Sequence, residues 1–121
     1  MKKLENINCY NLSVELSDLT WKIVSSWNNF AKNTVGNQLV RAVDSVAANI
    51  AEGFGRYHKK DKIKFYYNAR GSLFESQFFI KRALERQMIS QTQFETIISI
   101  MRSLPKEINY LIKITQTNLT K

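Results

Sequence analysis

The middle of the chain reads Asn49-Ile50-Ala51-Glu52-Gly53-Phe54-Gly55-Arg56 and, fifteen residues further on, Gly71-Ser72-Leu73. The first run closes an apolar-periodic segment on two glycines, which we expect to end a helix because glycine adopts positive φ without a Cβ clash. Gly71 lies inside the next periodic segment, where a glycine costs about 1 kcal/mol relative to alanine. We expect it to pack closely against the alanine-rich face of the preceding helix; the alternative is a pocket lined by Gly71.

Apolar residues recur every three or four positions in four segments, at about residues 8–30, 35–54, 59–87 and 91–114. This spacing is typical of helices that bury one face. With four glycines and one proline in 121 residues, the chain has few positions at which a helix would break. The pattern predicts an all-α fold, an antiparallel up-down four-helix bundle that forms a single domain over residues 1–121.

Several local features follow from the same pattern. Asn33 or Thr34 is expected to cap the second helix and Ser90 the fourth, because their side chains accept hydrogen bonds from free N–H groups. Pro105 falls inside the fourth helix, so we expect a bend near Met101 rather than a break. The positions expected to be buried in the first helix are Leu12, Leu16, Leu19, Ile23 and Trp27.

The third segment is rich in aromatic residues. It contains more aromatic side chains than one narrow face of a helix holds: Phe65, Tyr66, Tyr67, Phe74, Phe78 and Phe79. A helix that is apolar on two sides is central in its fold or lies at a subunit interface. We therefore expect this helix to bury two sides.

The chain is strongly basic, with 18 Lys and Arg against 10 Asp and Glu, a formal charge of +8 and a pI near 9.8. Such a balance favours an acidic partner, although a soluble protein can also simply be basic. Like charges four residues apart repel, so phosphate contact would be a reason to keep them together. The alternative is a solvated face in which Glu85 partly neutralises Lys81. The candidate nucleic-acid-binding residues on the third helix are Lys59, Lys60, Lys62, Lys64, Lys81, Arg82 and Arg86.

Catalytic equipment is sparse. One His and one Cys supply no metal-ligand cluster and no nucleophile–base pair, so we expect no catalytic residue, metal or cofactor. Asn49 and Glu52, one turn apart, would either line a cleft or tie the second helix to Ser72 or Arg70. A lone carboxylate is poor equipment for acid–base catalysis, and His58 is most simply a cap or surface residue.

The expected compartment is the cytoplasm. Cys9 stands alone, which excludes an internal disulfide and fits a reducing environment. No apolar run approaches the ~20 residues that span a bilayer, and the N-terminus lacks a signal-peptide core. We expect no membrane partner.

The sequence resembles a known family in Gln38-Leu39-Val40-Arg41-Ala42, Ser45, residues 49–56 and Ala69-Arg70-Gly71-Ser72-Leu73-Phe74-Glu75. These runs are similar to those of the four-helix-bundle family of ribosomal-RNA intervening-sequence proteins, over roughly residues 10–114. The residues that carry the family motif are Asn49, Glu52, Gly53, Gly55, Arg56, Gly71 and Ser72. The resemblance implies an antiparallel four-helix subunit in a ring-shaped homopentamer, without enzymatic activity.

A more distant similarity connects the chain to accessory variability proteins of diversity-generating retroelements. Those proteins are basic pentamers that bind nucleic acid and a reverse transcriptase. We therefore expect a non-enzymatic oligomeric bundle that binds structured nucleic acid, RNA rather than DNA, through the third helix. The alternative is a protein-interaction scaffold, for example the partner of a reverse transcriptase. A passenger protein with little host function stays open, and an enzyme built on Glu52 and His58 is the least supported hypothesis.

Overall fold

The computed structural model describes residues 3–118. Within that range the chain forms four long helices and no strand, so the prediction of an all-helical four-helix bundle is confirmed. The long helices are α1 (Asn8–Ser25), α3 (Asn37–Gly55), α4 (Lys59–Glu85) and α5 (Gln91–Asn118). The short elements are a 3-10 turn η1 (Leu4–Asn6), α2 (Asn29–Ala31) and a π-helix η2 (Lys32–Gly36). None of the helices in the described range is long and apolar enough to cross a membrane.

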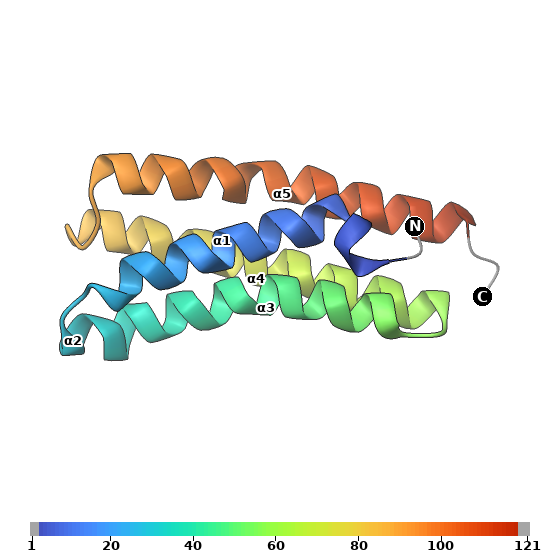
Figure 1. Ribbon diagram of the computed structural model, residues 1–121, viewed down its shortest axis with the longest axis horizontal. Coiled ribbons are helices and arrows are strands. Elements are labelled where there is room, and N and C mark those ends of the chain that lie inside the picture. Colours follow the sequence, from blue (N-terminus) through green and yellow to red (C-terminus); the bar gives the residue numbers. More distant parts are fainter. Residues whose placement is uncertain (1–2, 119–121) are drawn as a thin grey trace.

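The long helices lie side by side, and each runs back along the one before it (Figure 1). α1 packs against α3 and α5, and α4 packs against the same two helices. One end of the bundle therefore gathers the end of α3, the start of α4 and the end of α5. The opposite end gathers the end of α1, α2 and the connection from α4 to α5.

The apolar stripes of α3 and α5 form a large part of the core. On α3, Leu39, Val43, Val46 and Ile50 are fully buried. On α5 the buried side chains recur every three or four residues, as the spacing predicts. They are Ile97, Met101, Leu104, Ile108, Leu111 and Ile112.

α1 turns a different stripe inward from the predicted one. Its buried residues are Cys9, Ser13, Leu16, Thr20 and Val24, while Leu12, Leu19, Ile23 and Trp27 are only half-buried. Small residues at the centre of the stripe permit close approach of neighbouring helices, and the Ser13 hydroxyl is satisfied by donating to the Cys9 carbonyl at 2.6 Å. Of the predicted positions, Leu16 is fully buried, and Leu12, Ile23 and Trp27 pack against the core. The prediction missed Ser13 and Thr20 because it followed the largest side chains.

The second helical segment begins earlier than predicted. Asn28 caps it: its backbone is extended, and its side-chain Oδ1 accepts a hydrogen bond from the Ala31 N–H at 2.9 Å. The helical backbone then continues through η2 into α3. Asn33 and Thr34 therefore lie inside the helical segment, and α1 ends at Ser25 rather than at residue 30.

The glycines of the motif do not end α3 through positive φ. No glycine in the described range has positive φ, and α3 continues through Gly53 to Gly55. Gly53 instead permits contact with α4: a Cβ on it would lie 2.7 Å from the Tyr66 ring and 3.0 Å from the Lys62 carbonyl oxygen. Gly71 has open space around it, so the predicted close packing at that position was wrong.

α5 runs through Pro105 without interruption. A proline cannot donate to the carbonyl four residues earlier, which here belongs to Met101. Gln77 of α4 replaces that donor, with its Nε2 at 3.2 Å from the Met101 oxygen. The expected bend near Met101 stays a prediction.

The connection from α4 to α5 is closed by local hydrogen bonds. α4 ends at Glu85, two residues before the predicted end, and Gln87 adopts a positive φ of 59°. The N–H of Met88 donates to the Ala83 oxygen and that of Gln87 to the Leu84 oxygen, as in a Schellman motif. Ser90 caps α5 as predicted, through its Oγ and the Gln93 N–H at 3.0 Å.

Candidate nucleic-acid interface

The basic residues of α4 form two groups at opposite ends of the helix. Lys60 and Lys81 are 21 residues apart, which corresponds to about 30 Å along a helix that rises about 1.5 Å per residue. The first group is therefore close to the end of α3, and the second is close to η2 and the start of α5. A ligand that contacts both groups has to extend along the bundle.

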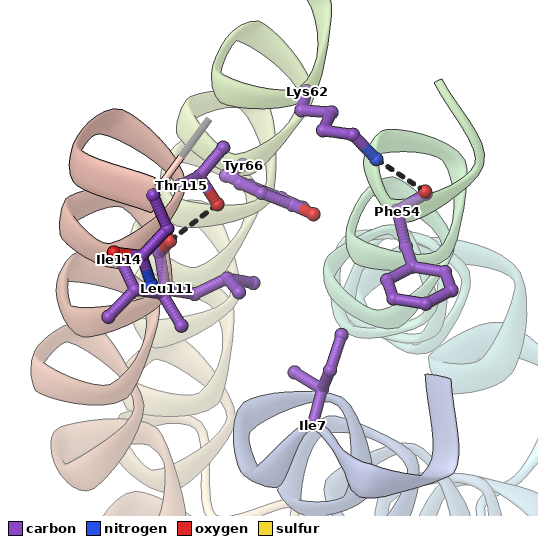
Figure 2. Close-up of a pocket in the computed structure, with 8 residues that line it drawn as sticks. Ile7, Phe54, Lys62, Tyr66, Leu111, Ile114 and Thr115 are labelled. Atoms are coloured by element: carbon purple, nitrogen blue, oxygen red, sulfur yellow. Dashed lines mark hydrogen bonds between the residues drawn. The ribbon is translucent and has the colours of Figure 1, made fainter. Parts of the chain in front are cut away.

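The first group divides into free and engaged cations. Lys60 and Lys64 are exposed and make no hydrogen bond or ion pair with residues 3–118. Lys59 donates through Nζ to the Gln116 carbonyl oxygen at 3.2 Å. Lys62 points inward and donates through Nζ to the Phe54 carbonyl oxygen at 2.7 Å, a contact drawn in Figure 2.

Lys62 is therefore not part of the candidate nucleic-acid-binding surface. Burial lowers the pKa of its amine from the ordinary value, and its ammonium group also lies 5.5 Å from the centre of the Phe54 ring. The sequence carried a signal for this orientation. Lys62 precedes Tyr66, Ala69 and Leu73 at intervals of four, three and four, and those three residues are buried.

The second group contains one ion pair. Arg82 Nη1 lies 2.8 Å from Glu85 Oε1, so Glu85 neutralises Arg82 rather than Lys81, contrary to the expectation. Lys81 and Arg86 are exposed and have no ion pair within residues 3–118. Four predicted cations are therefore both exposed and unneutralised: Lys60, Lys64, Lys81 and Arg86.

Aromatic side chains lie between the two groups on the same side of the helix. We call this side the outer α4 face; its residues are Lys60, Lys64, Tyr67, Gly71, Phe74, Phe78 and Lys81, all exposed and spaced by three or four. Tyr67, Phe74 and Phe78 are 44%, 53% and 56% exposed. These side chains are exposed in the single chain, so burial of a second side of α4 at a subunit interface stays a prediction.

Two polar residues of the family motif, Asn49 of α3 and Ser72 of α4, lie at the contact between these helices, away from the outer α4 face. Asn49 Nδ2 donates to both the carbonyl oxygen and Oγ of Ser45, at 2.8 and 2.9 Å. Ser45 Oγ lies 2.9 Å from Ser72 Oγ, so the three side chains connect the two helices. This arrangement satisfies polar groups at the helix contact.

The remaining polar motif residues make local contacts. Glu52 pairs with Arg56 at 2.8 Å along α3, and the Arg56 guanidinium lies 4.7 Å from the centre of the Phe65 ring. Arg70 donates to Asn109 Oδ1 of α5 at 2.6 Å, so it holds α5 rather than the end of α3. His58 precedes α4 and is exposed, with no side-chain capping bond and with Tyr57 edge-on to its ring.

Two hollows were not anticipated from the sequence. One lies beside the Ser45–Ser72 contact and is lined by Gln38, Arg41, Ala42, Ser45 and Glu75. The other lies at the end of the bundle, around Lys62 and Tyr66. Pattern reasoning missed both because each is formed by residues from different helices.

Comparison with known proteins identifies the family. The sequence matches the model of the 23S rRNA-intervening sequence protein over residues 5–110. A crystal structure of a protein of unknown function from the S23 ribosomal protein family of Bacteroides thetaiotaomicron has the same fold. It has a TM-score of 0.78 and 20% identity, with 87% of this chain and 98% of that chain covered. No curated protein matches the sequence. Because the family model covers most of the length, the chain belongs to the 23S rRNA-intervening sequence protein family.

Proposed function

We propose that this protein is a non-enzymatic, cytoplasmic nucleic-acid-binding protein that contacts the phosphates of structured RNA, in preference to DNA, through α4. The observation that carries the proposal is the set Lys60, Lys64, Lys81 and Arg86. All four are exposed and unneutralised within residues 3–118, in a chain whose formal charge is +8. Lysine and arginine side chains that neutralise phosphates release counterions, which drives binding and makes it depend on salt.

We also propose that the protein acts as a homo-oligomer, a pentameric ring of antiparallel up-down bundles. The outer α4 face supports self-association, because Tyr67, Phe74 and Phe78 form an uncovered aromatic stripe on a folded subunit. Five subunits in one ring would carry five times the charge of one chain. Such a particle would attract a polyanion over a longer distance than a monomer.

The salt dependence of binding tests the nucleic-acid proposal. An RNA hairpin and a DNA duplex of equal length are titrated with protein over a series of salt concentrations. Each phosphate contact that is lost should reduce the log–log slope by about 0.7 to 0.9. The test variant replaces Lys60, Lys64, Lys81 and Arg86 with Gln, and it should bind more weakly with a flatter slope.

A matched control is available on the other helices. Lys22, Lys106, Lys113 and Arg102 are also exposed, and their replacement with Gln removes the same charge from α1 and α5. The control should retain the wild-type slope. Equal slopes for the two variants, or no binding by the wild type at low salt, would remove the cations of α4 from the proposal.

A protein-interaction scaffold, such as a partner of a reverse transcriptase, is the second candidate function. The same exposed aromatic stripe favours it, since exposed apolar patches mark protein interaction sites. Light scattering separates this candidate from self-association. Particles of roughly five times 14.1 kDa support the ring, whereas a monomer at micromolar concentration leaves the stripe open to a different protein.

A further inference from the structure

The end of the bundle that joins α3 to α4 contains a cavity of about 170 Å³ (Figure 2). Its lining comes from every long-helix region: the residue before α1, the end of α3, the start of α4 and the end of α5. The lining residues are Ile7, Phe54, Lys62, Tyr66, Leu111, Ile114, Thr115 and Asn118. We call it the end pocket.

Most of the end pocket is apolar. Ile7, Phe54, Leu111 and Ile114 supply its hydrocarbon walls. The volume is close to the roughly 150 Å³ that holds one benzene molecule in a protein interior. The pocket therefore suits an organic body of about one aromatic ring.

Lys62 brings a positive charge into this apolar site. Its Nζ donates one hydrogen bond, to the Phe54 carbonyl oxygen at 2.7 Å. An ammonium group has three donors and no acceptor, so two donors remain. Within residues 3–118 no carboxylate forms an ion pair with Lys62, and the positive charge has no counter-charge.

Tyr66 adds a second donor one helical turn further on. Tyr66 is 2% exposed, and its hydroxyl makes no hydrogen bond with the described residues. In Figure 2 this hydroxyl points into the space between Phe54, Ile7 and Leu111. Burial and the nearby Cys9 raise the pKa of Tyr66 to about 12, so the hydroxyl is neutral and able to donate at physiological pH.

Thr115 contributes little to a binding site of this kind. Its hydroxyl proton is used in a bond to the Leu111 carbonyl oxygen at 2.8 Å. Asn118, on the last turn of α5, accepts from Thr117 Oγ1 at 3.3 Å and keeps its amide donors, but it is exposed. The unused donors on the interior side of the end pocket are those of Lys62 and Tyr66. A ligand that satisfies both has to present acceptors, and a negative charge on it would compensate Lys62.

We propose that the end pocket binds a small carboxylic acid with an apolar body of about the size of benzoate. The carboxylate accepts hydrogen bonds from Lys62 Nζ and Tyr66 Oη, and the body lies against Ile7, Phe54, Leu111 and Ile114. This site is independent of the proposed nucleic-acid interface, because neither Lys62 nor Tyr66 belongs to the outer α4 face. Failure of one proposal therefore leaves the other standing.

Three probes separate the contributions of charge and apolar body. Benzoate, benzyl alcohol and inorganic phosphate are titrated into the ¹⁵N-labelled full chain, and amide shifts are followed by NMR. Benzoate should give saturable shifts at Ile7, Phe54 and Leu111. Benzyl alcohol should bind about tenfold more weakly, because it lacks the charge that strengthens a hydrogen bond to Lys62.

Inorganic phosphate provides the opposite test, since it has charge without an apolar body. It should produce no saturable shift at Ile7 or Leu111. Phosphate binding equal to that of benzoate would overturn the proposal in favour of a general anion site. Absence of benzoate shifts at tens of millimolar would also overturn it.

Matched variants assign the binding to the named side chains. Lys62→Met should weaken benzoate binding about tenfold or more, and Tyr66→Phe about fivefold, the effects of losing a charged and a neutral donor. Lys64→Met, two residues further along α4 and exposed, removes the same charge and should leave the affinity unchanged. Equal affinities of the Lys62 and Lys64 variants would overturn the assignment.

Circular dichroism melting accompanies each titration to show that the variants fold. Lys62→Met also removes the bond to the Phe54 carbonyl oxygen, so it could lower the melting temperature. Tyr66→Phe leaves the charge and that bond in place. If Lys62→Met does not fold, the benzoate affinity of Tyr66→Phe tests the proposal. A fivefold loss of affinity would support it, and an unchanged affinity would overturn it.

Discussion

The inner and outer faces of α4 carry different kinds of side chain, and they differ in what covers them. The inner face is rich in small residues, with Ala69, Ser76 and Ala83 fully buried against the rest of the bundle. The outer face has larger side chains, yet Phe74 and Phe78 are more than half exposed. These small residues alternate with the buried Tyr66, Leu73 and Ile80 and permit close approach of neighbouring helices, whereas a stripe of aromatic side chains faces outward.

The largest expected difference in stability between inner-face and outer-face variants is at the adjacent residues Leu73 and Phe74. Leu73 is 0% exposed and Phe74 53% exposed. Leu73→Ala should lower the free energy of unfolding by about 2–5 kcal/mol, because it leaves a cavity. Phe74→Ala should change the stability of the subunit by about 0.5 kcal/mol or less.

Urea unfolding measures both variants. In dilute protein the two free energies should differ strongly, and similar losses would contradict the distinction between the faces. At higher concentration, sedimentation should show weaker self-association for Phe74→Ala if subunits meet through the outer α4 face.

Replacement of Gly53, near the end of α3, and of Gly71, inside α4, should change the stability in opposite directions. Gly53→Ala forces a Cβ against the Tyr66 ring at 2.7 Å and the Lys62 carbonyl oxygen at 3.0 Å, and overpacking of this kind costs about 1–3 kcal/mol. Gly71→Ala meets open space, so it should raise the stability by up to about 1 kcal/mol through helix propensity. Thermal melting should move down for the first variant and up for the second; a shift in the same direction would refute the contrast.

The Ser45–Ser72 contact, at the border of the inner face, should have a smaller effect. Ser45→Ala removes the partner that Ser72 and Asn49 share, and the expected loss is about 1 kcal/mol. Ser99→Ala is the control, since Ser99 is exposed on α5 and makes no hydrogen bond within the described residues. Indistinguishable urea midpoints for the two variants would show that the contact adds no stability.

Tyr66, on the inner face, should make the stability of the subunit depend on pH, with no effect at neutral pH. The pKa of Tyr66 is raised from 10.0 to about 12 by burial, which favours the neutral phenol in the folded chain. This stabilisation is complete below pH 10 and is lost as the pH rises towards 12. Tyr66→Phe should therefore show a shallower alkaline loss of stability than the wild type.

Cys9 also makes the folded chain less stable at alkaline pH, so part of the alkaline loss of stability should persist in Tyr66→Phe. Burial raises its pKa from 9.0 to about 12, so its stabilisation is also lost as the pH rises over that interval. Unfolding free energies measured from pH 7 to pH 12 test both residues. A Tyr66→Phe profile as steep as that of the wild type would contradict the assignment.

Most of the fold could be predicted from the sequence where large apolar residues alone form the core. The stripes from Leu39 to Ile50 and from Ile97 to Ile112 follow the helical period, and Ser90 is followed by a helix start that it caps. Prediction failed where small or polar residues face inward. The stripe of α1 contains Ser13 and Thr20, and no count of apolar residues identifies them as buried.

The candidate sites were less predictable because they depend on neighbours from other helices. Gly53 and Gly71 have identical propensities, and only the position of α4 relative to α3 decides which one is crowded. Likewise, Lys62 looks like its basic neighbours until Phe54 and α5 are placed around it. The four-residue spacing from Lys62 to the buried Tyr66 indicates that Lys62 faces inward. The prediction nevertheless placed Lys62 on the basic surface because its side chain is charged.

The bond from Gln77 to the Met101 carbonyl helps to specify the alignment of α5 along α4. The buried side chains of α5 recur so regularly that a slip by one turn, about 5.4 Å, would bring similar hydrocarbon groups against the same neighbours. Met101 differs from the residues around it because Pro105 has removed the usual donor to its carbonyl oxygen. Gln77 meets that oxygen in only one register. A proline that would ordinarily weaken a helix thus creates one of the contacts that align these two helices, alongside the bond from Arg70 to Asn109.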